Sequence, residues 1–282
     1  MEAIDCSIRL TSTTAKALKD AGIVAVGRYL GYKNQGWSKT LTPDELKVIQ
    51  AVGLSVFLIW ESNPTTSGYF SYNKGISDAK LALEEAAYLG APNNTAVYFT
   101  VDFDAQSSNM AAIIEYFRGV CEGVNGQYLV GAYGSYNVLL ALKTSSYAPN
   151  KYYQTYAWSN GSVFTGNDIY QYQNDITLQG VAVDRDTIQY NAGCWPEMEE
   201  NDVKLNYLVL YYGDADLQIA ANMAQNFQCP IVQAVYATAD LLASATNKYQ
   251  VGGNSAPDGV ILLAGEDRFA TMKAVLNAMG KI

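Results

Sequence analysis

The stretch Tyr98–Asp104, YFTVDFD, begins as an apolar strand and ends in two acids that are two residues apart. Because side chains alternate between the two faces of a strand, Thr100, Asp102 and Asp104 share one face. The other face is entirely apolar, and it carries Phe99, Val101 and Phe103. This pattern predicts a strand whose apolar face packs against outer helices and whose polar face points into the mouth of a barrel.

Strand-like and helix-like segments alternate on both sides of this stretch. Strands are predicted at residues 4–7, 23–29, 54–60, 96–103, 128–133, 152–158, 169–173 and 181–184. Helices are predicted between them at residues 14–21, 42–52, 75–89, 111–124 and 137–143. This order predicts an α/β fold in which residues 1–195 form a (β/α)8-type barrel. Helices are short or missing in its second half, so the barrel is expected to be irregular, and an open doubly wound sheet is the competing architecture.

A second, smaller unit follows the predicted barrel. Residues 196–204 hold a proline, an acidic cluster and no hydrophobic periodicity, which is typical of a linker. Beyond it, strands are predicted at residues 207–212, 230–234, 249–251 and 259–264. Helices are predicted at residues 215–227, 238–245 and 267–279. Residues 205–282 are therefore expected to form a small α/β domain, close to the minimum size that folds unaided.

Charge and composition exclude several classes of partner. The formal net charge of −9 argues against binding of nucleic acid or of an anionic membrane surface. No apolar run approaches the roughly 18 residues of a membrane span. The N-terminus lacks a basic segment followed by an apolar one, so no secretory signal is expected. The four cysteines lie far apart without a Cys-x-x-Cys pair, which argues against disulfides and a zinc site. No cofactor and no metal ion are implied.

The sequence contains no histidine. This absence excludes nucleophilic catalysis by Ser-His-Asp or Cys-His groups, and it excludes zinc peptidases and amidases that rely on imidazole ligands. In an enzyme of this composition, proton transfer would depend on Asp, Glu, Tyr, Lys or Cys. Carboxylates are the leading candidates, and a pair of them is the hallmark of glycoside hydrolysis.

Polar and acidic side chains follow almost every strand of the predicted barrel. In such barrels the catalytic residues lie at the carboxyl ends of the strands. The predicted catalytic residues at these ends are Asp5, Glu61, Asp102, Asp104 and Asp184. The predicted substrate-binding residues are Arg28, Tyr133, Trp158, Gln171 and Gln173. Carboxyls that cluster raise one another's pKa, so one can stay protonated as a general acid while its neighbour is ionised.

Each of these residues also has a purely structural explanation. An aspartate after a strand commonly forms a turn or caps a helix, and Asp186, which precedes a threonine, fits that role. Glu61 would then pair with Arg28 at the end of the neighbouring strand. The aromatic residues would fill the core or the rim. The convergence of several acids favours function, because carboxylates gathered at one rim repel each other.

Five short motifs carry a resemblance to a known family. They are IDCS at residues 4–7, GRYLG at 27–31, VDFD at 101–104, YQYQ at 170–173 and VDRD at 183–186. Their order resembles that of glycoside hydrolase family 25 lysozymes, and GRYLG with VDFD is closer to the glycoside-hydrolase-like domains related to that family. The resemblance covers residues 3–195. It implies a barrel that hydrolyses glycosidic bonds of peptidoglycan by carboxylate acid–base catalysis, as a muramidase does.

The resemblance also implies roles for the acids. Asp5 would shape the sugar site, and Asp184 would complete the acidic cluster. Asp102 would stabilise the positive charge or the N-acetyl group of the substrate, as in substrate-assisted retention. Asp104 stands where the lysozymes have a glutamate general acid, and its shorter side chain departs from their pattern. Glu61 is therefore a rival for the general acid.

The second unit resembles the C-terminal cell-wall-binding domain of phage endolysins active against clostridia. The matching segments are YLVLYYGDADLQIAANMAQNFQCP at residues 207–230, YQVGGN at 249–254 and LLAGEDRFATMKAVLNAM at 262–279. A wall hydrolase joined to a wall-binding module is the plan of such an endolysin. Its partners would be peptidoglycan and a wall polymer of a Gram-positive host. It would accumulate in the host cytoplasm and then be released to the cell wall.

Met198 stands at the boundary between the two predicted domains. We hypothesise that an internal translation start or a cleavage point there yields a separate binding domain, which self-associates with full-length chains. An ordinary linker methionine is the alternative.

Two other functions compete with the muramidase-like endolysin. A barrel that has lost catalysis would be a saccharide-binding or cell-wall-binding protein. A polysaccharide hydrolase that acts outside the wall is the third hypothesis. The substitution of aspartate for glutamate at position 104 keeps the binding hypothesis open.

Overall fold

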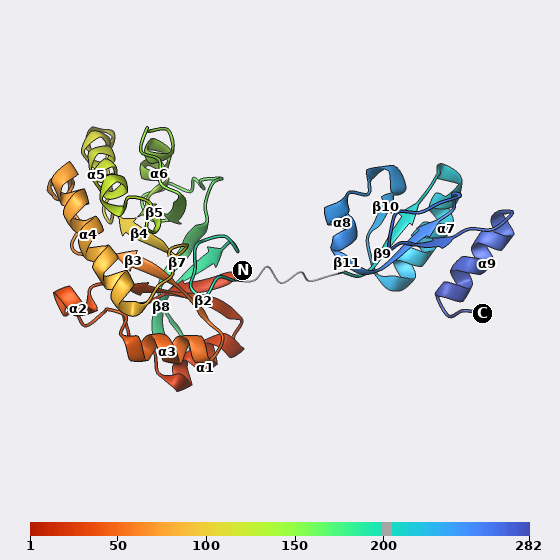
Figure 1. Ribbon diagram of the computed structural model, residues 1–282, viewed down its shortest axis with the longest axis horizontal. Helices are drawn as coiled ribbons and strands as arrows, with labels where there is room; N and C mark the ends of the chain where they lie inside the picture. The colour runs from red at the N-terminus through yellow and green to blue at the C-terminus, as the bar shows by residue number, and fades with distance from the viewer. Residues whose placement is uncertain (199–204) are drawn as a thin grey trace. The chain divides into compact units, whose positions relative to one another are not determined.

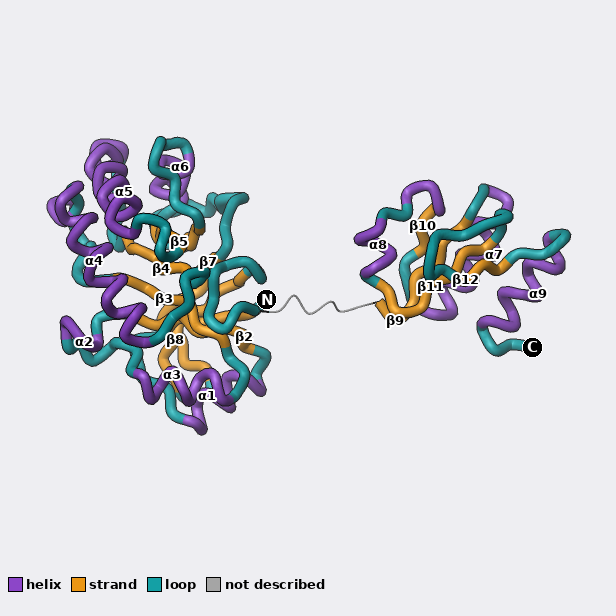
Figure 2. Tube along the Cα trace, viewed as in Figure 1, coloured by secondary structure: helices purple, strands orange, loops and turns teal. Residues whose placement is uncertain are grey.

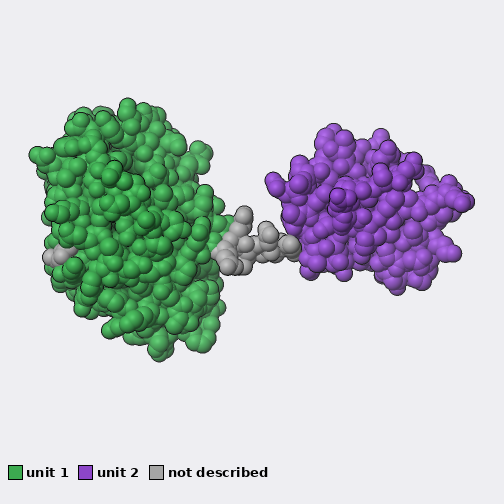
Figure 3. All heavy atoms as spheres, viewed as in Figure 1, with its two compact units in different colours: residues 1–199 green, residues 200–282 purple. Residues whose placement is uncertain are grey.

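The computed structural model describes residues 1–198 and 205–282 of the chain. The chain divides into two compact units, Met1–Glu199 and Glu200–Ile282, which Figure 3 shows in green and purple. Most of the predicted linker, residues 196–204, lies outside the described residues. Its described beginning belongs to the first unit, where Met198 packs against apolar side chains of the barrel interior.

The first unit is a closed barrel of eight strands (Figures 1 and 2). In barrel order they are β1 (Glu2–Asp5), β2 (Ile23–Tyr29), β3 (Ser55–Trp60), β4 (Ala96–Thr100), β5 (Leu129–Gly134), β6 (Lys151–Thr155), β7 (Ile169–Leu178) and β8 (Val181–Ile188). The predicted α/β barrel is confirmed. The open doubly wound sheet is wrong, because β8 pairs with β1 and closes the ring.

Helices connect the strands and pack outside the barrel (Figure 1). They are α1 (Ser12–Asp20), α2 (Tyr32–Gln35), α3 (Pro43–Ala51), α4 (Tyr72–Leu89), α5 (Met110–Val124) and α6 (Tyr136–Lys143), with 3-10 turns η1 (Ser67–Tyr69) and η2 (Ser107–Asn109). The Thr42 side chain accepts a hydrogen bond from the Glu45 amide and caps α3. Gly90, with a φ of 81°, ends α4. Such local signals explain why the sequence predicts these helices.

The last two strands depart from a regular (β/α)8 barrel. Only Gln179 and Gly180 join β7 to β8, and both have positive φ angles, 50° and 79°. Positive φ at both central residues is typical of a type I′ hairpin turn, and so short a connection requires antiparallel pairing. β8 therefore runs antiparallel to both β7 and β1. Asp184 and Asp186 lie within β8 rather than after its carboxyl end, which corrects their predicted position.

The predicted alternation of β4 holds as far as the end of the strand. Tyr98 belongs to the interior of the barrel, whereas Val97 and Phe99 belong to the apolar layer beneath the helices. β4 ends at Thr100, three residues before the predicted end. The amide of Asp102 donates to the carbonyl oxygen of Pro64 in the loop after β3, so it does not extend the strand.

Aromatic rings fill the barrel interior below its carboxyl end. The rings of Phe57, Tyr98 and Tyr153 meet edge to face, with centroids 5.6 to 6.1 Å apart. Gly27 leaves room for them, because a Cβ there would lie 2.4 Å from the Phe57 ring. Gly131 does the same for Tyr98, with a corresponding distance of 2.4 Å. These three rings form the floor on which the polar groups of the barrel mouth rest.

The second unit is built on one parallel sheet with the strand order β10-β9-β11-β12. Its strands are β9 (Leu205–Tyr211), β10 (Ile231–Gln233), β11 (Ala245–Val251) and β12 (Ile261–Leu263). Its helices are α7 (Asp214–Phe227), α8 (Ala239–Ala243) and α9 (Arg268–Ala278), with the 3-10 turn η3 (Ala234–Tyr236). These elements agree with the predicted small α/β unit in type and order. In the described parts of the chain, no helix is both long and apolar enough to span a membrane.

Candidate active site

The carboxyl end of the barrel encloses a polar cavity of about 190 Å³. Four acids from different parts of the barrel line it: Asp5, Glu61, Asp102 and Asp184. The other lining residues are Tyr29, Ile59, Thr100, Tyr133, Tyr153 and Gln171. The structure thus brings together four of the predicted catalytic acids and two of the predicted substrate-binding residues.

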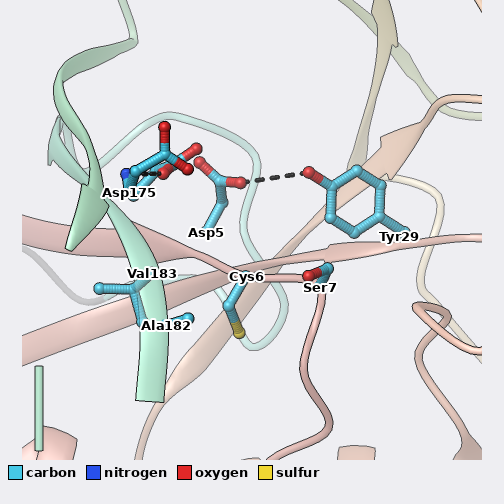
Figure 4. Close-up of a pocket in the computed structure, with 8 residues that line it drawn as sticks. Asp5, Cys6, Ser7, Tyr29, Asp175, Ala182 and Val183 are labelled. Carbon is cyan, nitrogen blue, oxygen red and sulfur yellow. Dashed lines mark hydrogen bonds between the residues drawn. The ribbon is translucent and has the colours of Figure 1, made fainter. Parts of the chain in front are cut away.

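Among these acids, Asp5 is the most enclosed, with 4% of its surface exposed. The Tyr153 hydroxyl donates to its Oδ2 atom at 2.6 Å, and Gln171 Nε2 donates to the same oxygen at 3.0 Å. The Tyr29 hydroxyl donates to Oδ1 at 3.3 Å (Figure 4). Burial is the main cause that raises the pKa of Asp5 to about 7, and the negative charge of Asp184 raises it further. The three hydrogen bonds act in the opposite direction.

Asp184 is held beside Asp5 by the antiparallel pairing of β8 with β1. The two residues are direct partners in this pairing, which places their Cβ atoms roughly 4.5–5.5 Å apart. Gln171 Nε2 donates to Oδ2 of Asp184 at 3.1 Å, and the Asp175 amide donates to Oδ1 at 2.8 Å. Burial raises the pKa of Asp184, and the charges of Asp175 and Asp102 add to the rise.

Glu61 and Asp102 form the other acidic pair of the cavity. Lys39 makes an ion pair with Glu61, and its ammonium lies 4.4 Å from the ring centre of Tyr29. Burial is the largest cause that raises the pKa of both carboxyls, and the charge of Lys39 lowers it in both. The charge of Asp102 also raises the pKa of Glu61, so the two carboxyls are close enough to interact.

Two predicted site residues lie away from the cavity because of the strand geometry. Asp104 is exposed and is not one of the described lining residues, since β4 has ended and its alternation no longer applies. Arg28 occupies the outward face of β2, where it is fully buried and pairs with Glu45 at 2.9 Å. The predicted inward position of Asp104, the predicted substrate contact of Arg28 and the alternative Arg28–Glu61 pair are therefore wrong.

Trp158 and Gln173 also lie away from the cavity. Trp158 stands in the turn after β6, where it is 38% exposed. The register of β7 shifts between Gln171 and Gln173, so the two amides no longer share a face. Gln171 is buried and Gln173 is exposed. Neither Trp158 nor Gln173 belongs to the described residues that line this cavity, and their contact with substrate stays a prediction.

Several residues of the site are not among the predicted ones. Tyr29 is the last residue of β2. The rule that functional residues lie at the carboxyl ends of barrel strands is therefore enough to identify it. Tyr153 lies in the middle of β6, and only its alternation with Thr155 indicates an inward position. Lys39 lies in the loop between α2 and α3 and carries no local signal. Asp186 is not the turn cap of the alternative interpretation: it is fully buried, and its Oδ1 atom lies within hydrogen-bond distance, 2.9 Å, of the Tyr153 hydroxyl oxygen.

The chemistry of the cavity depends on its carboxyls. Among the described residues, no group of three or more His, Cys, Asp or Glu side chains is arranged to hold a metal ion. Neighbouring carboxyls whose pKa values are raised to different extents can divide into protonated and ionised members near neutral pH. The arrangement is therefore suited to general acid–base chemistry on a polar substrate.

Comparison with known sequences connects the barrel to other proteins. Residues 16–191 match the Rv2525c-like, glycoside hydrolase-like domain. FadG of Bacillus subtilis strain 168 is 37% identical over 142 residues, which are 48% of this chain and 25% of FadG. The chain therefore spans about a quarter of the length of this curated relative.

Solved structures that align with this chain include a mycobacterial protein and an endolysin. The Tat-secreted protein Rv2525c of Mycobacterium tuberculosis, in complex with L-tartrate, aligns with a TM-score of 0.60 at 18% identity and covers 69% of this chain and 98% of that chain. The CTP1L endolysin aligns with a TM-score of 0.47 at 18% identity and covers 100% of this chain and 99% of that chain. The likeness to Rv2525c shows a shared barrel fold. Because the family match spans more than half of its residues, this chain belongs to the family of Rv2525c-like, glycoside hydrolase-like domains.

Proposed function

We propose that the barrel hydrolyses glycosidic bonds in the glycan strands of bacterial peptidoglycan, as a lysozyme does. The observation that carries the proposal is the gathering of four acids at one polar cavity: Asp5, Glu61, Asp102 and Asp184. Glycoside hydrolysis needs one carboxyl that protonates the leaving oxygen and another group that stabilises the positive centre. Tyrosine hydroxyls and an amide in the lining fit a substrate rich in hydroxyl groups. Membership of a glycoside hydrolase-like family supports the same class of reaction.

Glu61 is the residue to which we assign the role of general acid. It lines the cavity, its side chain is the longest among the four acids, and burial raises its pKa. Asp102 would be the ionised partner that stabilises the positive charge or the N-acetyl group of the substrate. Asp5 and Asp184, which are connected through Gln171, would orient the sugar.

Glu61→Gln tests this assignment, with Asp104→Asn as its control. General acid catalysis typically contributes 10²–10⁴-fold, so Glu61→Gln should slow the turbidity loss of Gram-positive cell walls by about 10²-fold or more. Asp104→Asn, at an exposed position, should stay within about threefold of wild type. Mass spectrometry of the released glycan ends identifies the bond that is cut. An active Glu61→Gln variant together with an inactive Asp104→Asn variant would reverse the assignment.

The ion pair between Lys39 and Glu61 favours a second function, which is saccharide binding without hydrolysis. A nearby ammonium group stabilises the ionised carboxylate and so opposes the protonation that a general acid needs. A barrel in that state would still bind glycan through its hydroxyls and amides. Wild-type protein that binds cell walls but releases no glycan ends after long incubation would establish this second function.

We also propose that the second unit binds a cell-wall polymer at the carboxyl ends of its parallel strands. An open pocket of about 620 Å³ lies there, lined by Tyr212, Gln250, Ala234, Val235, Ser255, Ala256 and Pro257. In open parallel sheets, ligands bind at this edge where the connections from two adjacent strands lead in opposite directions. β9 and β11 are such a pair, since β9 connects to β10 on one side and β11 connects to β12 on the other. Tyr212 is 60% exposed, so its ring is available for stacking on a sugar.

Tyr212→Ala tests this binding site, and Phe269→Ala is its control. Phe269 is 82% exposed but is not one of the described residues that line the pocket. Loss of one stacking ring should weaken binding of the whole chain to purified walls by about 1 kcal/mol, or about fivefold in Kd. Hydrolysis of soluble glycan fragments should not change. Equal losses in both variants would indicate unspecific hydrophobic adhesion instead.

A separate product that begins near Met198 is a further proposal about the second unit. Met198 packs against the barrel interior in the full-length chain, so a product that starts there would lose this contact and contain the second unit. Mass spectrometry of purified protein would detect such a product, and Met198→Leu should abolish it if translation starts there. A product that persists in Met198→Leu would indicate cleavage. Co-purification with the full-length chain would support self-association, and the absence of any such product would refute the proposal.

A further inference from the structure

Asp186 is a buried acid that the proposed mechanism does not use. It lies in β8, two residues beyond Asp184, and pairs with Ala3 of β1. Its side chain is fully buried, and it does not belong to the described residues that line the cavity. A fully buried carboxyl is costly when ionised unless it is paired and hydrogen-bonded. Its protonation state therefore depends on its few neighbours.

The Tyr153 hydroxyl connects Asp186 to Asp5. It lies 2.9 Å from Oδ1 of Asp186 and 2.6 Å from Oδ2 of Asp5. A hydroxyl has one proton, so it can donate to only one of these carboxyls. With both carboxyls ionised, one of the two short oxygen–oxygen contacts would lack a proton. One additional proton completes the chain, because Asp186 can then donate to the Tyr153 oxygen while Tyr153 donates to Asp5.

The remaining partners indicate which carboxyl carries this additional proton. Asp5 accepts two further hydrogen bonds, from Gln171 and from Tyr29, and such bonds favour the ionised form. No donor within the described chain reaches the Oδ2 atom of Asp186. An ionised Asp186 would bury a charged oxygen without a partner, which is the costlier arrangement.

The groups that face Asp186 inside the barrel are Asp5 of β1, Tyr153 of β6 and Asp184 of β8. Glu2 of β1 and Tyr172 of β7 interact with it only through charge, because they lie with Arg185 on the outer face. Arg185 is adjacent in sequence, but it points to the other face of β8 and pairs with Glu2 at 2.7 Å. Burial, and after it the negative charge of Asp5, raises the pKa of Asp186 well above its usual range.

We propose that Asp186 is a positioning residue that keeps its proton, donates it to the Tyr153 oxygen and thereby directs the Tyr153 hydroxyl toward Asp5. Above its pKa of about 7, Asp5 is thereby held as an ionised carboxylate that faces the cavity. Asp5 in turn orients the amide of Gln171, which also binds Asp184. Loss of the proton at higher pH leaves two carboxylates that compete for one hydroxyl. The sugar-orienting groups then lose their arrangement.

Asp186→Asn is the variant that tests this role, and Asp104→Asn is the matched control at an exposed site. The asparagine amide can still donate to the Tyr153 oxygen, but it cannot lose a proton in this range. The inference rests on the proposed function only for the class of ligand, a peptidoglycan glycan fragment. Thermal unfolding of the barrel supplies a second measurement that is independent of any ligand.

The unfolding temperature of the wild-type barrel should fall as the pH rises. A raised pKa means that the folded barrel keeps a proton that the unfolded chain has released. This contribution to stability is complete below about pH 4 and is lost as the pH rises through the folded pKa. Asp186→Asn lacks it, so its unfolding temperature should fall less steeply with rising pH than that of wild type. Asp104→Asn should follow wild type, and an Asp186→Asn curve parallel to wild type would overturn the inference.

Glycan affinity, measured by calorimetry in the Glu61→Gln background, should also depend on pH more strongly with Asp186 than with Asp186→Asn. In the protein that keeps Asp186, the Kd should weaken by about tenfold from about pH 7.5 to about pH 9.5. In Asp186→Asn the change over this range should be within about threefold. In Tyr153→Phe the connection is missing, so adding Asp186→Asn should not alter the pH dependence further. The inference would be overturned if, in proteins that retain Tyr153, the Kd depended on pH to the same extent with Asp186 as with asparagine at this position. If no glycan binds at any pH while the thermal contrast is present, the proposed function fails and the role of Asp186 stands.

Discussion

Two groups of buried acids in the first unit differ in whether they have a cationic partner. One group lies between the strands and the outer helices, and the other lies in the barrel interior. Beneath the helices, Glu45 is 4% exposed and pairs with Arg28. Arg28 Nε and the Leu10 amide donate to its Oε1 atom at 2.9 Å, and Arg28 Nη2 donates to Oε2 at 3.2 Å. Asp78 is fully buried as well, and Lys74 lies 2.6 Å from it. Each of these outer acids thus has a cation of its own.

The inner acids of the barrel, Asp5, Asp184 and Asp186, have no such partner. None of the ion pairs among the described residues includes Asp5, Asp184 or Asp186. They share hydroxyl and amide donors, and burial together with one another's charges raises their pKa values. A carboxylate that is matched to a buried cation is confined to one charge state. Carboxyls that share donors can change their charge, and perturbed pKa values of this kind are typical of functional sites.

The largest effect on stability is expected from breaking an outer pair. Glu45→Leu leaves Arg28 buried without a counter-charge and should destabilise the barrel by about 3–5 kcal/mol. Chemical denaturation followed by tryptophan fluorescence reports on the barrel, because all four tryptophans lie in the first unit. The double variant Arg28→Met with Glu45→Leu should recover most of the loss. A double variant as unstable as the single one would show that the unmatched charge is not the cause.

A smaller effect, visible mainly as a pH dependence, is expected from Asp184→Asn in the inner group. The pKa of Asp5 is raised to about 7, in part by the charge of Asp184. The wild-type barrel should therefore lose stability as the pH rises from about 4 through about 7. Asp184→Asn should lose less over this range, because one raised carboxyl is absent and the pKa of Asp5 is lower. Urea denaturation at about pH 5 and about pH 8 measures the difference. Equal losses would mean that Asp184 does not control the titration of Asp5.

The smallest effect is expected from Lys39→Met, which makes Glu61 resemble the inner acids by removing its cation. The charge of Lys39 lowers the pKa of Glu61 and of Asp102, so its loss should raise both. The pair is partly exposed to solvent, so the alkaline limb of kcat should move upward by less than about one pH unit. A pH–rate profile of wall hydrolysis measures this shift. A movement to lower pH would contradict the assignment of Glu61 as general acid.

The predicted site residues that line the cavity differ from those that do not in the signal that led to their prediction. Asp5 and Glu61 follow strands that their apolar runs reveal, and parallel strands bring their carboxyl ends to one rim. Arg28 was predicted at the site because it stands near the end of a strand, but its face of β2 is the outer one. Asp104 and Gln173 were predicted at the site by assuming that side chains continue to alternate between the two faces of β4 and β7 as far as these residues. β4 ends at Thr100 and β7 shifts its register before Gln173, and both events depend on partners that are distant in sequence.

By itself, the sequence determined the class of fold, the approximate position of most strands and helices, and the reliance of any proton transfer on carboxyls. These features follow from side-chain alternation, helix caps and the absence of histidine, which are local or compositional. Only the tertiary structure decided which acids meet and which charges they carry. Tyr153 joins Asp5, 148 residues away, to Asp186, 33 residues away, because β8 runs antiparallel to β1. Burial and neighbouring charges set a pKa, and both exist only after the distant strands have paired.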